Sequence, residues 1–138
     1  MKFEFSAGGI VFRKDDNKTF VLVSKHSEHH GWVFPKGLIG DSIKGEDRKS
    51  TALREVKEET GINAKILKSL NPVFYFYIWE GEKIKKTVYY FLMEYLSGDF
   101  EERDFEMEEV KWILKENVEK RLTYKSDKKV WQEAKVDL

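Results

Sequence analysis

The chain has 138 residues, with 25 lysines and arginines against 25 aspartates and glutamates, so its formal net charge is zero at pH 7. Its 41% hydrophobic residues exclude a disordered chain, and its lack of cysteine excludes a disulfide scaffold, a thiolate zinc site and a cysteine nucleophile. The zero net charge argues against a broad electrostatic grip on nucleic acid, and there is no apolar run of the ~20 residues that span a bilayer. We expect a single domain over residues 1–138. We also expect this domain to be cytoplasmic, with no membrane association and no stable nucleic-acid partner.

The first half of the chain contains two β-rich stretches and one helix. The β-rich stretches are residues 3–13 and 20–25, separated by a polar turn cluster. A long connection, residues 26–46, follows, and connections of this length in small domains are usually functional or mobile. Residues 47–60 have a helical pattern, with Gly61 placed as the C-terminal stop.

The second half adds more strands and a helical tail. Two β-rich stretches, 63–79 and 84–96, surround the sequence EGEK, which predicts a hairpin. Both faces of 73–79 are apolar, which favours a central strand. Residues 109–114 predict a short strand, and the chain from Lys115 onward is helical in character. This order predicts an α+β fold in which a mixed sheet is sandwiched between helices, an α/β/α arrangement.

The predicted helix carries a cluster of acids on one side. Glu55, Glu58 and Glu59 fall within an arc of roughly 100° at about 100° per residue. Like charges at these spacings repel one another, yet carboxylate oxygens are the ligands that magnesium and manganese prefer. An isolated cluster of this kind is more often a solvated acidic face than a metal site.

This cluster is part of a longer motif that covers residues 40–62, preceded by a loop at 32–39. The pattern is G-x5-E-x7-R-E-U-x-E-E-x-G-U, where U is aliphatic, and it is matched by Gly40, Glu46, Arg54, Glu55, Val56, Glu58, Glu59, Gly61 and Ile62. With this motif and its strand order, the chain resembles the Nudix hydrolases over nearly its whole length. The resemblance implies cleavage of a nucleoside diphosphate linked to another group, with a divalent metal, on an α/β/α sandwich.

The resemblance also implies roles for the motif residues. Glu55, Glu58 and Glu59 would hold magnesium, or manganese, that bridges to substrate phosphates, and Glu55 is also a candidate base for the attacking water. Arg54 and Glu46 would form an ion pair that orients Glu55, provided that the loop folds back over the helix. The alternative for this pair is a surface salt bridge of little energetic value.

The glycine that begins the motif is ambiguous. The literal spacing selects Gly40, but the sequence WVFPKG at 32–37 resembles the segment that leads into the motif in related tetraphosphatases, and this alignment selects Gly37. We favour Gly37 as the residue whose carbonyl reaches the metal. Lys36 is then a phosphate contact, and its alternative is an exposed loop lysine.

A second acidic run occupies residues 99–109. Most such runs are solvated loops. Nudix hydrolases often supply a further carboxylate just before a late strand, and Glu108 and Glu109 both occupy that place. We rank Glu109 slightly higher as a catalytic candidate.

Aromatic and basic residues after the helix are candidates for substrate binding. Tyr75 and Tyr77 share one strand face and could stack on a nucleobase, with core packing as the alternative. Tyr77 occupies the position of a tyrosine in dinucleoside tetraphosphate hydrolases, which this chain resembles. Lys86 and Tyr89 are similar candidates for phosphate and base contacts, and the segment 123–129 also resembles that subfamily.

The three histidines, at 26, 29 and 30, lack the paired spacing of zinc ligands and are expected at the surface, with a phosphate contact as the alternative.

Together, the motif and the resemblance predict a magnesium-dependent pyrophosphohydrolase whose partner is a nucleotide polyphosphate, in particular a dinucleoside polyphosphate such as diadenosine tetraphosphate. One alternative is an enzyme that acts on nucleoside triphosphates or on the 5′ triphosphate of RNA. Another is a catalytically silent Nudix-like domain that binds nucleotides.

Overall fold

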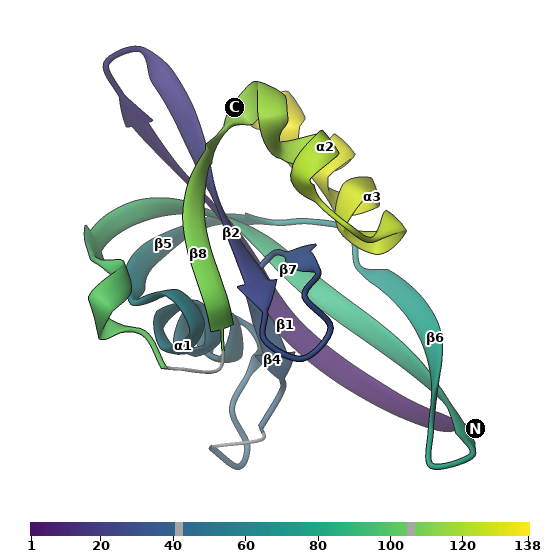
Figure 1. Ribbon diagram of the computed structural model, residues 1–138. Coiled ribbons are helices and arrows are strands. Elements are labelled where there is room, and N and C mark those ends of the chain that lie inside the picture. Colours follow the sequence, from purple (N-terminus) through teal and green to yellow (C-terminus); the bar gives the residue numbers. More distant parts are fainter. Residues whose placement is uncertain (41–42, 105–106) are drawn as a thin grey trace.

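The computed structural model describes residues 1–40, 43–104 and 107–138 (Figure 1). Its strands are β1 (Lys2–Asp15), β2 (Lys18–His26), β3 (Trp32–Val33), β4 (Lys36–Leu38), β5 (Ile62–Ser69), β6 (Val73–Trp79), β7 (Glu82–Gly98) and β8 (Met107–Leu114). Its α-helices are α1 (Arg48–Thr60), α2 (Val118–Arg121) and α3 (Lys125–Ala134). Two positions of the predicted motif, 41 and 42, and two of the acidic run, 105 and 106, lie outside the described residues.

The described strands form one mixed sheet built around two long strands. β1 and β7 pair in parallel from Lys2↔Ile84 to Phe12↔Glu94, whereas the other pairs are antiparallel. At one end of the sheet, β4 and β6 flank the first halves of β1 and β7, and we call this four-stranded part the wing. At the other end, β2 and β5 flank the second halves, and β8 and β3 pair with β2.

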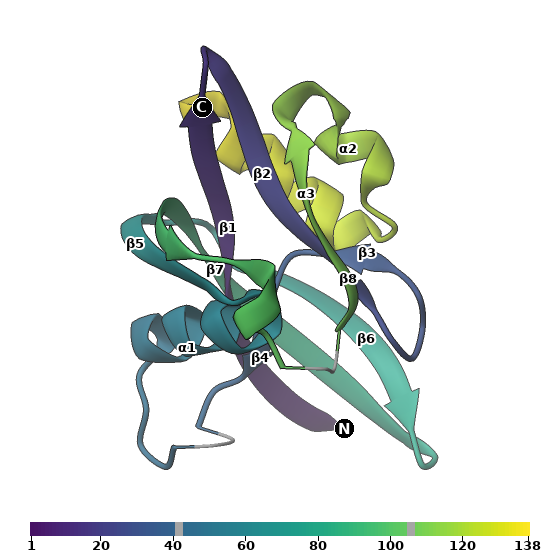
Figure 2. The same cartoon turned by 60° about the vertical axis from the view of Figure 1, so that its left-hand side comes forward.

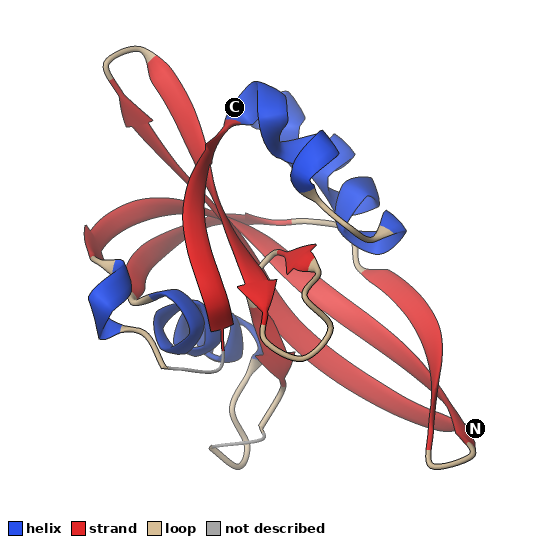
Figure 3. Cartoon of the chain, viewed as in Figure 1, coloured by secondary structure: helices blue, strands red, loops and turns tan. Residues whose placement is uncertain are grey.

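Helices cover both faces of the sheet, so the predicted α/β/α arrangement is confirmed (Figure 1 and Figure 2). On one face, Ala52 and Val56 of α1 pack into a core with Val11, Phe91 and Met93. On the other face, the core includes Val130 and Trp131 of α3 together with apolar residues of β1, β2 and β7. Figure 3 shows how this sheet separates α1 from the α2–α3 pair.

The predicted helix, hairpin and late strand are present with small shifts at their ends. α1 begins after Asp47, whose side chain accepts a hydrogen bond from the Ser50 amide, and ends at Gly61, which has a φ of 82°. That left-handed conformation is the usual stop of a helix and favours glycine. The hairpin joins β6 to β7 at Glu80 and Gly81, both with positive φ. β8 covers the strand predicted at 109–114, and the predicted helical tail consists of α2, α3 and short 3-10 turns.

Two expectations about strands were wrong. The stretch 63–79 is two strands, β5 and β6, because the chain turns at residues 70–72 and the two strands pair with different halves of β7. β6 is an edge strand rather than a central one, since among the described residues it pairs only with β7. Its second apolar face is therefore exposed instead of buried, as Phe74 and Ile78 show.

No helix in the part of the chain that the structure describes is both long and apolar enough to cross a membrane.

Candidate active site

Two acids of α1, Glu55 and Glu59, lie beside the apolar residues of the helix and are buried with them. Ala52 and Val56 are fully buried against the sheet, whereas Thr51, Glu55 and Glu59 form a second row at intervals of four residues. Glu55 is only 6% exposed and Glu59 only 8% exposed. Burying a carboxylate is costly unless it has charged or hydrogen-bonding partners, so the contacts of these two residues indicate what the site can bind.

Arg54 connects three of the acids. Its Nε and Nη2 donate to Glu46, with Nε to Oε2 at 3.0 Å, while its Nη1 donates to Glu55 Oε1 at 2.9 Å and to both oxygens of Glu58 at 3.1 Å. Thr51 Oγ1 donates a further hydrogen bond of 2.7 Å to Glu46. The loop before α1 thus folds back over the helix, which was the condition for the Arg54–Glu46 ion pair.

These contacts favour the charged forms of both Glu46 and Arg54. The hydrogen bond from Arg54 is the main cause that lowers the pKa of Glu46, and the hydrogen bond to Glu46 raises the pKa of Arg54 above its ordinary value. Side chains of Arg54 and Glu46 are 13% and 5% exposed, so solvent screens this pair far less than a surface salt bridge. Both groups stay ionised, and the guanidinium is fixed beside Glu55.

The structure separates the two candidate glycines. Gly37 lies on β4, and a Cβ built on it would stand 2.0–2.3 Å from the carboxyl atoms of Glu55. The next residue back, Lys36, donates its backbone N–H to Glu59 Oε2 at 3.0 Å. Gly40 instead has a φ of 77°, and a Cβ built on it would stand 3.7 Å from the Ile43 carbonyl oxygen, so Gly40 serves the turn after β4. Gly37, and not Gly40, is in contact with the acids of α1.

The donors around Gly37 suit a magnesium ion in chemical type. They are carboxylates and backbone carbonyls, and the absence of a side chain at Gly37 leaves its backbone next to Glu55. Within residues 1–40, 43–104 and 107–138, no three acidic or imidazole side chains converge into a ready-made cage. Magnesium in proteins is usually held by one or two carboxylates together with waters and substrate phosphates.

A cleft lies on the α3 side of the wing, next to this carboxylate cluster. Its volume is about 680 Å³, and it is lined by Tyr75, Tyr77, Lys36 and residues of the segment 123–129. A smaller cavity of about 190 Å³ adjoins it and shares Lys36 and Tyr75, and it adds Glu59 and Lys86. Four predicted binding residues, Lys36, Tyr75, Tyr77 and Lys86, therefore lie along one path that leads to the acids of α1.

The cleft also contains residues that the sequence did not assign, and Phe74 and Phe76 of β6 are among those that line it. Tyr124 and Asp127 come from the segment 123–129, and His29 comes from the histidine segment; Tyr124 Oη lies 2.8 Å from His29 Nδ1. Partial burial and the neighbouring His26 lower the pKa of His29. The resemblance of segment 123–129 to the tetraphosphatases was the signal for Tyr124 and Asp127, but spacing alone could not show that α3 packs its first turn against β6.

Charges in the cleft are organised around Lys36. Burial acts to lower the pKa of Lys36, but Asp127, Tyr75 and Glu59 outweigh it, so its pKa is raised. Asp127 is 3% exposed and accepts hydrogen bonds from the Phe34 amide and from Tyr90 Oη.

Two other cleft residues, Lys86 and Tyr77, also have shifted pKa values. Burial and the charge of Lys36 lower the pKa of Lys86. Burial and a hydrogen bond to Glu4 raise the pKa of Tyr77 to about 12.

We expect Asp127→Asn to weaken phosphate binding at alkaline pH. Removing the Asp127 charge lowers the pKa of Lys36, so Lys36 loses its proton at a lower pH and the alkaline rise in KM begins earlier than in the wild type. The measurement is KM for the preferred substrate between pH 7 and pH 10.5. The matched control is Tyr90→Phe, which removes one hydrogen bond to Asp127 but leaves its charge. Identical profiles for Asp127→Asn and the wild type would contradict the prediction.

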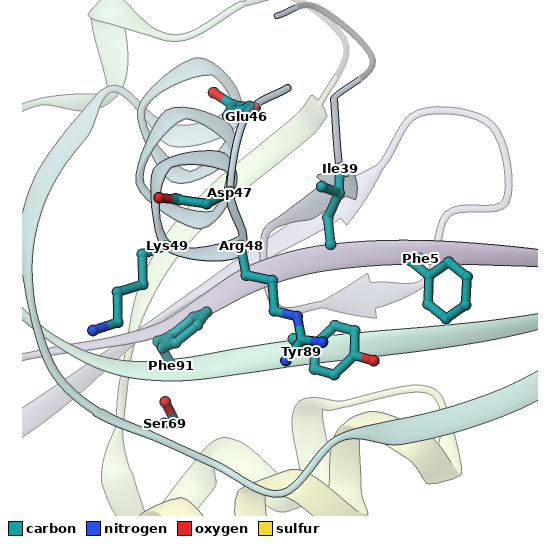
Figure 4. Close-up of a pocket in the computed structure, with 9 residues that line it drawn as sticks. All are labelled: Phe5, Ile39, Glu46, Asp47, Arg48, Lys49, Ser69, Tyr89 and Phe91. Atoms are coloured by element: carbon teal, nitrogen blue, oxygen red, sulfur yellow. The ribbon is translucent and has the colours of Figure 1, made fainter. Parts of the chain in front are cut away.

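Two predicted residues lie away from the cleft. Tyr89 points to the α1 side of the sheet, where the Arg48 guanidinium stands 3.8 Å from its ring centroid, and it lines a different cavity (Figure 4). Glu109 forms an ion pair of 3.2 Å with Lys111, and its neighbour Glu108 contacts Lys25 and His30.

Comparison with known proteins gives one family. Residues 2–134 match the NUDIX domain family. The chain is 34% identical over 133 residues to a putative mutator protein MutT4 of Mycobacterium tuberculosis, covering 92% of this chain but about half (52%) of that protein. It is 38% identical over 105 residues to the asymmetrical bis(5'-nucleosyl)-tetraphosphatase of Rattus norvegicus, covering 71% of this chain and 69% of the relative.

A further curated relative is the RNA pyrophosphohydrolase of Pelagibacter ubique, which is 32% identical over 123 residues, covering 80% of this chain and 76% of the relative. Among solved structures, an Ap4A hydrolase of C. elegans in a binary complex matches with a TM-score of 0.72 and 24% identity, covering 97% of this chain and 95% of the other. That structural likeness shows a shared fold.

Proposed function

This chain belongs to the Nudix family, whose members are pyrophosphohydrolases that act on phosphoanhydride bonds, and we propose that it cleaves dinucleoside polyphosphates such as diadenosine tetraphosphate with magnesium as cofactor. The observation that carries the proposal is the continuous path from the tyrosines of the cleft, through Lys36, to the acids of α1. Such a path fits a substrate with a nucleobase at one end and several phosphates that reach the reacting centre.

Binding in the cleft follows from its chemistry. Tyr75 and Tyr124 offer flat surfaces for a nucleobase, and stacking of this kind contributes about 1–3 kcal/mol per base. Lys36 and Lys86 would contact the phosphates, with Lys36 kept charged by Asp127. Because the lowered pKa of Lys86 results from burial and from Lys36, a bound polyphosphate would strengthen its protonated form.

Hydrolysis requires a water molecule to attack a phosphorus atom while the bridging oxygen leaves with the nucleotide. Glu55 is the residue that we propose to accept the proton of the attacking water, and Arg54, held by Glu46, positions its carboxylate. Glu55, Glu58, Glu59 and the carbonyl of Gly37 would hold magnesium, which neutralises phosphate charge when bound. This assignment leaves Glu109 without a role that the described contacts support, and it leaves Tyr89 outside the substrate path.

A second candidate substrate is the 5′ end of RNA. The similarity to the RNA pyrophosphohydrolase of Pelagibacter ubique favours it, since that relative covers most of the chain. The same cleft would then hold the terminal nucleotide, and the same acids would act on its phosphates.

The deciding experiment compares substrates under identical conditions. Diadenosine tetraphosphate, a nucleoside triphosphate, ADP-ribose and an RNA with a 5′ triphosphate are assayed with magnesium and with a chelator. We expect kcat/KM for diadenosine tetraphosphate to exceed that of the others by at least about tenfold, equivalent to about 1.4 kcal/mol of transition-state discrimination, and to vanish with the chelator. A preference for the RNA or for ADP-ribose would refute the substrate, and turnover that survives the chelator would refute the metal.

A further inference from the structure

The α1-side face of the wing carries aromatic and basic side chains in matching rows. Phe3 of β1 pairs with Lys85 of β7, which pairs with Phe76 of β6, and Phe5 is connected to Phe74 through Thr87 in the same way. Cross-strand partners project from the same side of a sheet, so these residues share one surface. We call it the cation–aromatic face, and it consists of Phe3, Phe5, Phe74, Phe76, Lys83 and Lys85.

The rings on this face are available to a partner. The four phenylalanines are each 47–57% exposed. The lysines lie over two of them, with Lys85 Nζ 4.4 Å from the Phe74 ring centroid and Lys83 Nζ 4.7 Å from that of Phe76. Contiguous exposed apolar surface of this kind usually marks a binding site.

The face continues into a cavity below the start of α1. This cavity of about 770 Å³ is lined by Phe5 and Tyr89, and Arg48 reaches down from α1 over the Tyr89 ring (Figure 4). It adds a further cation–ring pair to the two on the cation–aromatic face. The two acids that line the cavity are already engaged, since Glu46 binds Arg54 and Asp47 caps α1.

The charge of this face is one-sided although the chain is neutral. The positions that share this face are the alternate residues from Phe3 to Ala7 on β1, from Phe74 to Ile78 on β6 and from Lys83 to Tyr89 on β7. Every charged residue at these alternate positions is a lysine. The ligand that complements it is therefore anionic and carries flat apolar groups. A second copy of the chain is a poor fit, because a two-fold contact through this face would bring its lysines together.

We propose that the cation–aromatic face binds single-stranded nucleic acid. Bases would stack on the exposed phenylalanines and on Tyr89, while the phosphates would contact Lys83, Lys85 and Arg48. Interleaved aromatic and basic side chains on an open sheet are the general means by which proteins hold unpaired bases. The inference goes beyond the proposed hydrolysis, because Phe3, Phe5, Lys83 and Lys85 do not line the cleft, although Phe74 and Phe76 of the edge strand β6 border both surfaces. The zero net charge of the chain does not preclude such binding, because lysines are in local excess on this face.

The test measures binding of a fluorescein-labelled 10-nucleotide RNA with a 5′-hydroxyl group, which offers no phosphoanhydride bond to the active site. We expect binding by anisotropy that weakens at least about tenfold in Phe3→Ala/Phe5→Ala, because base stacking is lost. The slope of log K against log salt should be about −2 for three phosphate contacts and should become shallower by about 1.4 in Lys83→Glu/Lys85→Glu.

The matched control is Lys14→Glu/Lys18→Glu, which makes the same charge change on exposed residues at the β1–β2 hairpin. It should reduce affinity less than the inversion at Lys83 and Lys85, and circular dichroism should show that each variant folds. Absence of binding, equal weakening by both inversions, or equal affinity for the RNA as a duplex would overturn the proposal. So would a dimer, detected by light scattering and lost in Phe3→Ala/Phe5→Ala, without RNA binding.

Discussion

Replacing Glu55 by glutamine is expected to lower kcat by about three orders of magnitude, the range in which loss of a general base and of a metal-binding carboxylate falls. Glutamine keeps the size of the side chain and one oxygen that can accept a hydrogen bond from Arg54 Nη1. In the wild type this hydrogen bond, to Glu55 Oε1, is 2.9 Å long. It cannot take a proton from water, and it is a weaker ligand for magnesium. The measurement is kcat for the preferred substrate at saturating magnesium.

The fold should survive this change. Glu55 is buried but lies among polar partners, so we expect the thermal midpoint to shift by only a few degrees. The control is Glu102→Gln, the same substitution on an exposed acid that forms an ion pair with Lys57 of α1. The kcat of this variant should stay near the wild-type value. If Glu55→Gln retains near-normal kcat in a folded protein, the role that we propose for Glu55 is wrong.

Gly37→Ala should have an effect of similar size through geometry alone. The new methyl carbon would stand 2.0–2.3 Å from the Glu55 carboxyl atoms, a distance at which one group must move. Displacing a catalytic carboxylate by about 1 Å can cost roughly a hundredfold in rate, so we expect a loss of at least that size in kcat. The measurement is kcat together with the magnesium concentration required for half-maximal activity, which should rise.

Gly40→Ala separates this effect from the general cost of replacing a loop glycine. Gly40 has a φ of 77°, so alanine there is strained and should lower the free energy of unfolding by about 1 kcal/mol. Among the residues that the structure describes, its Cβ would meet the Ile43 carbonyl oxygen at an ordinary contact distance of 3.7 Å, so activity should change little. The reverse ranking of the two variants in kcat would assign the motif position to Gly40.

Local features of the site could be predicted because they depend on spacing within one element. The helical period alone places Glu55, Glu58 and Glu59 together, and Gly61 can end the helix because glycine adopts positive φ without strain. The Arg54–Glu46 contact was conditional on the path of a loop. The structure meets the condition, since Thr51 and Arg54 both bind Glu46.

Features that depend on strand neighbours could not be predicted in the same way. Tyr75, Tyr77 and Tyr89 all looked equally suitable, but the register of β6 and β7 directs the first two to the α3 side and Tyr89 to the α1 side. The apolar pattern of β6 predicted a central strand, because a pattern reports apolar faces and not whether another strand pairs with them.

The family motif, the acids of α1 and the alternation of strands and helices could be read from the sequence, since each depends on residues a few positions apart. The position of Gly37 beside Glu55, the effect of Asp127 on the pKa of Lys36 and the exposure of the phenylalanines of the wing became clear from the folded chain. These features join residues from separate elements. Their distances are set by how the sheet pairs and how the helices pack on it, and the spacing along the chain does not contain that information.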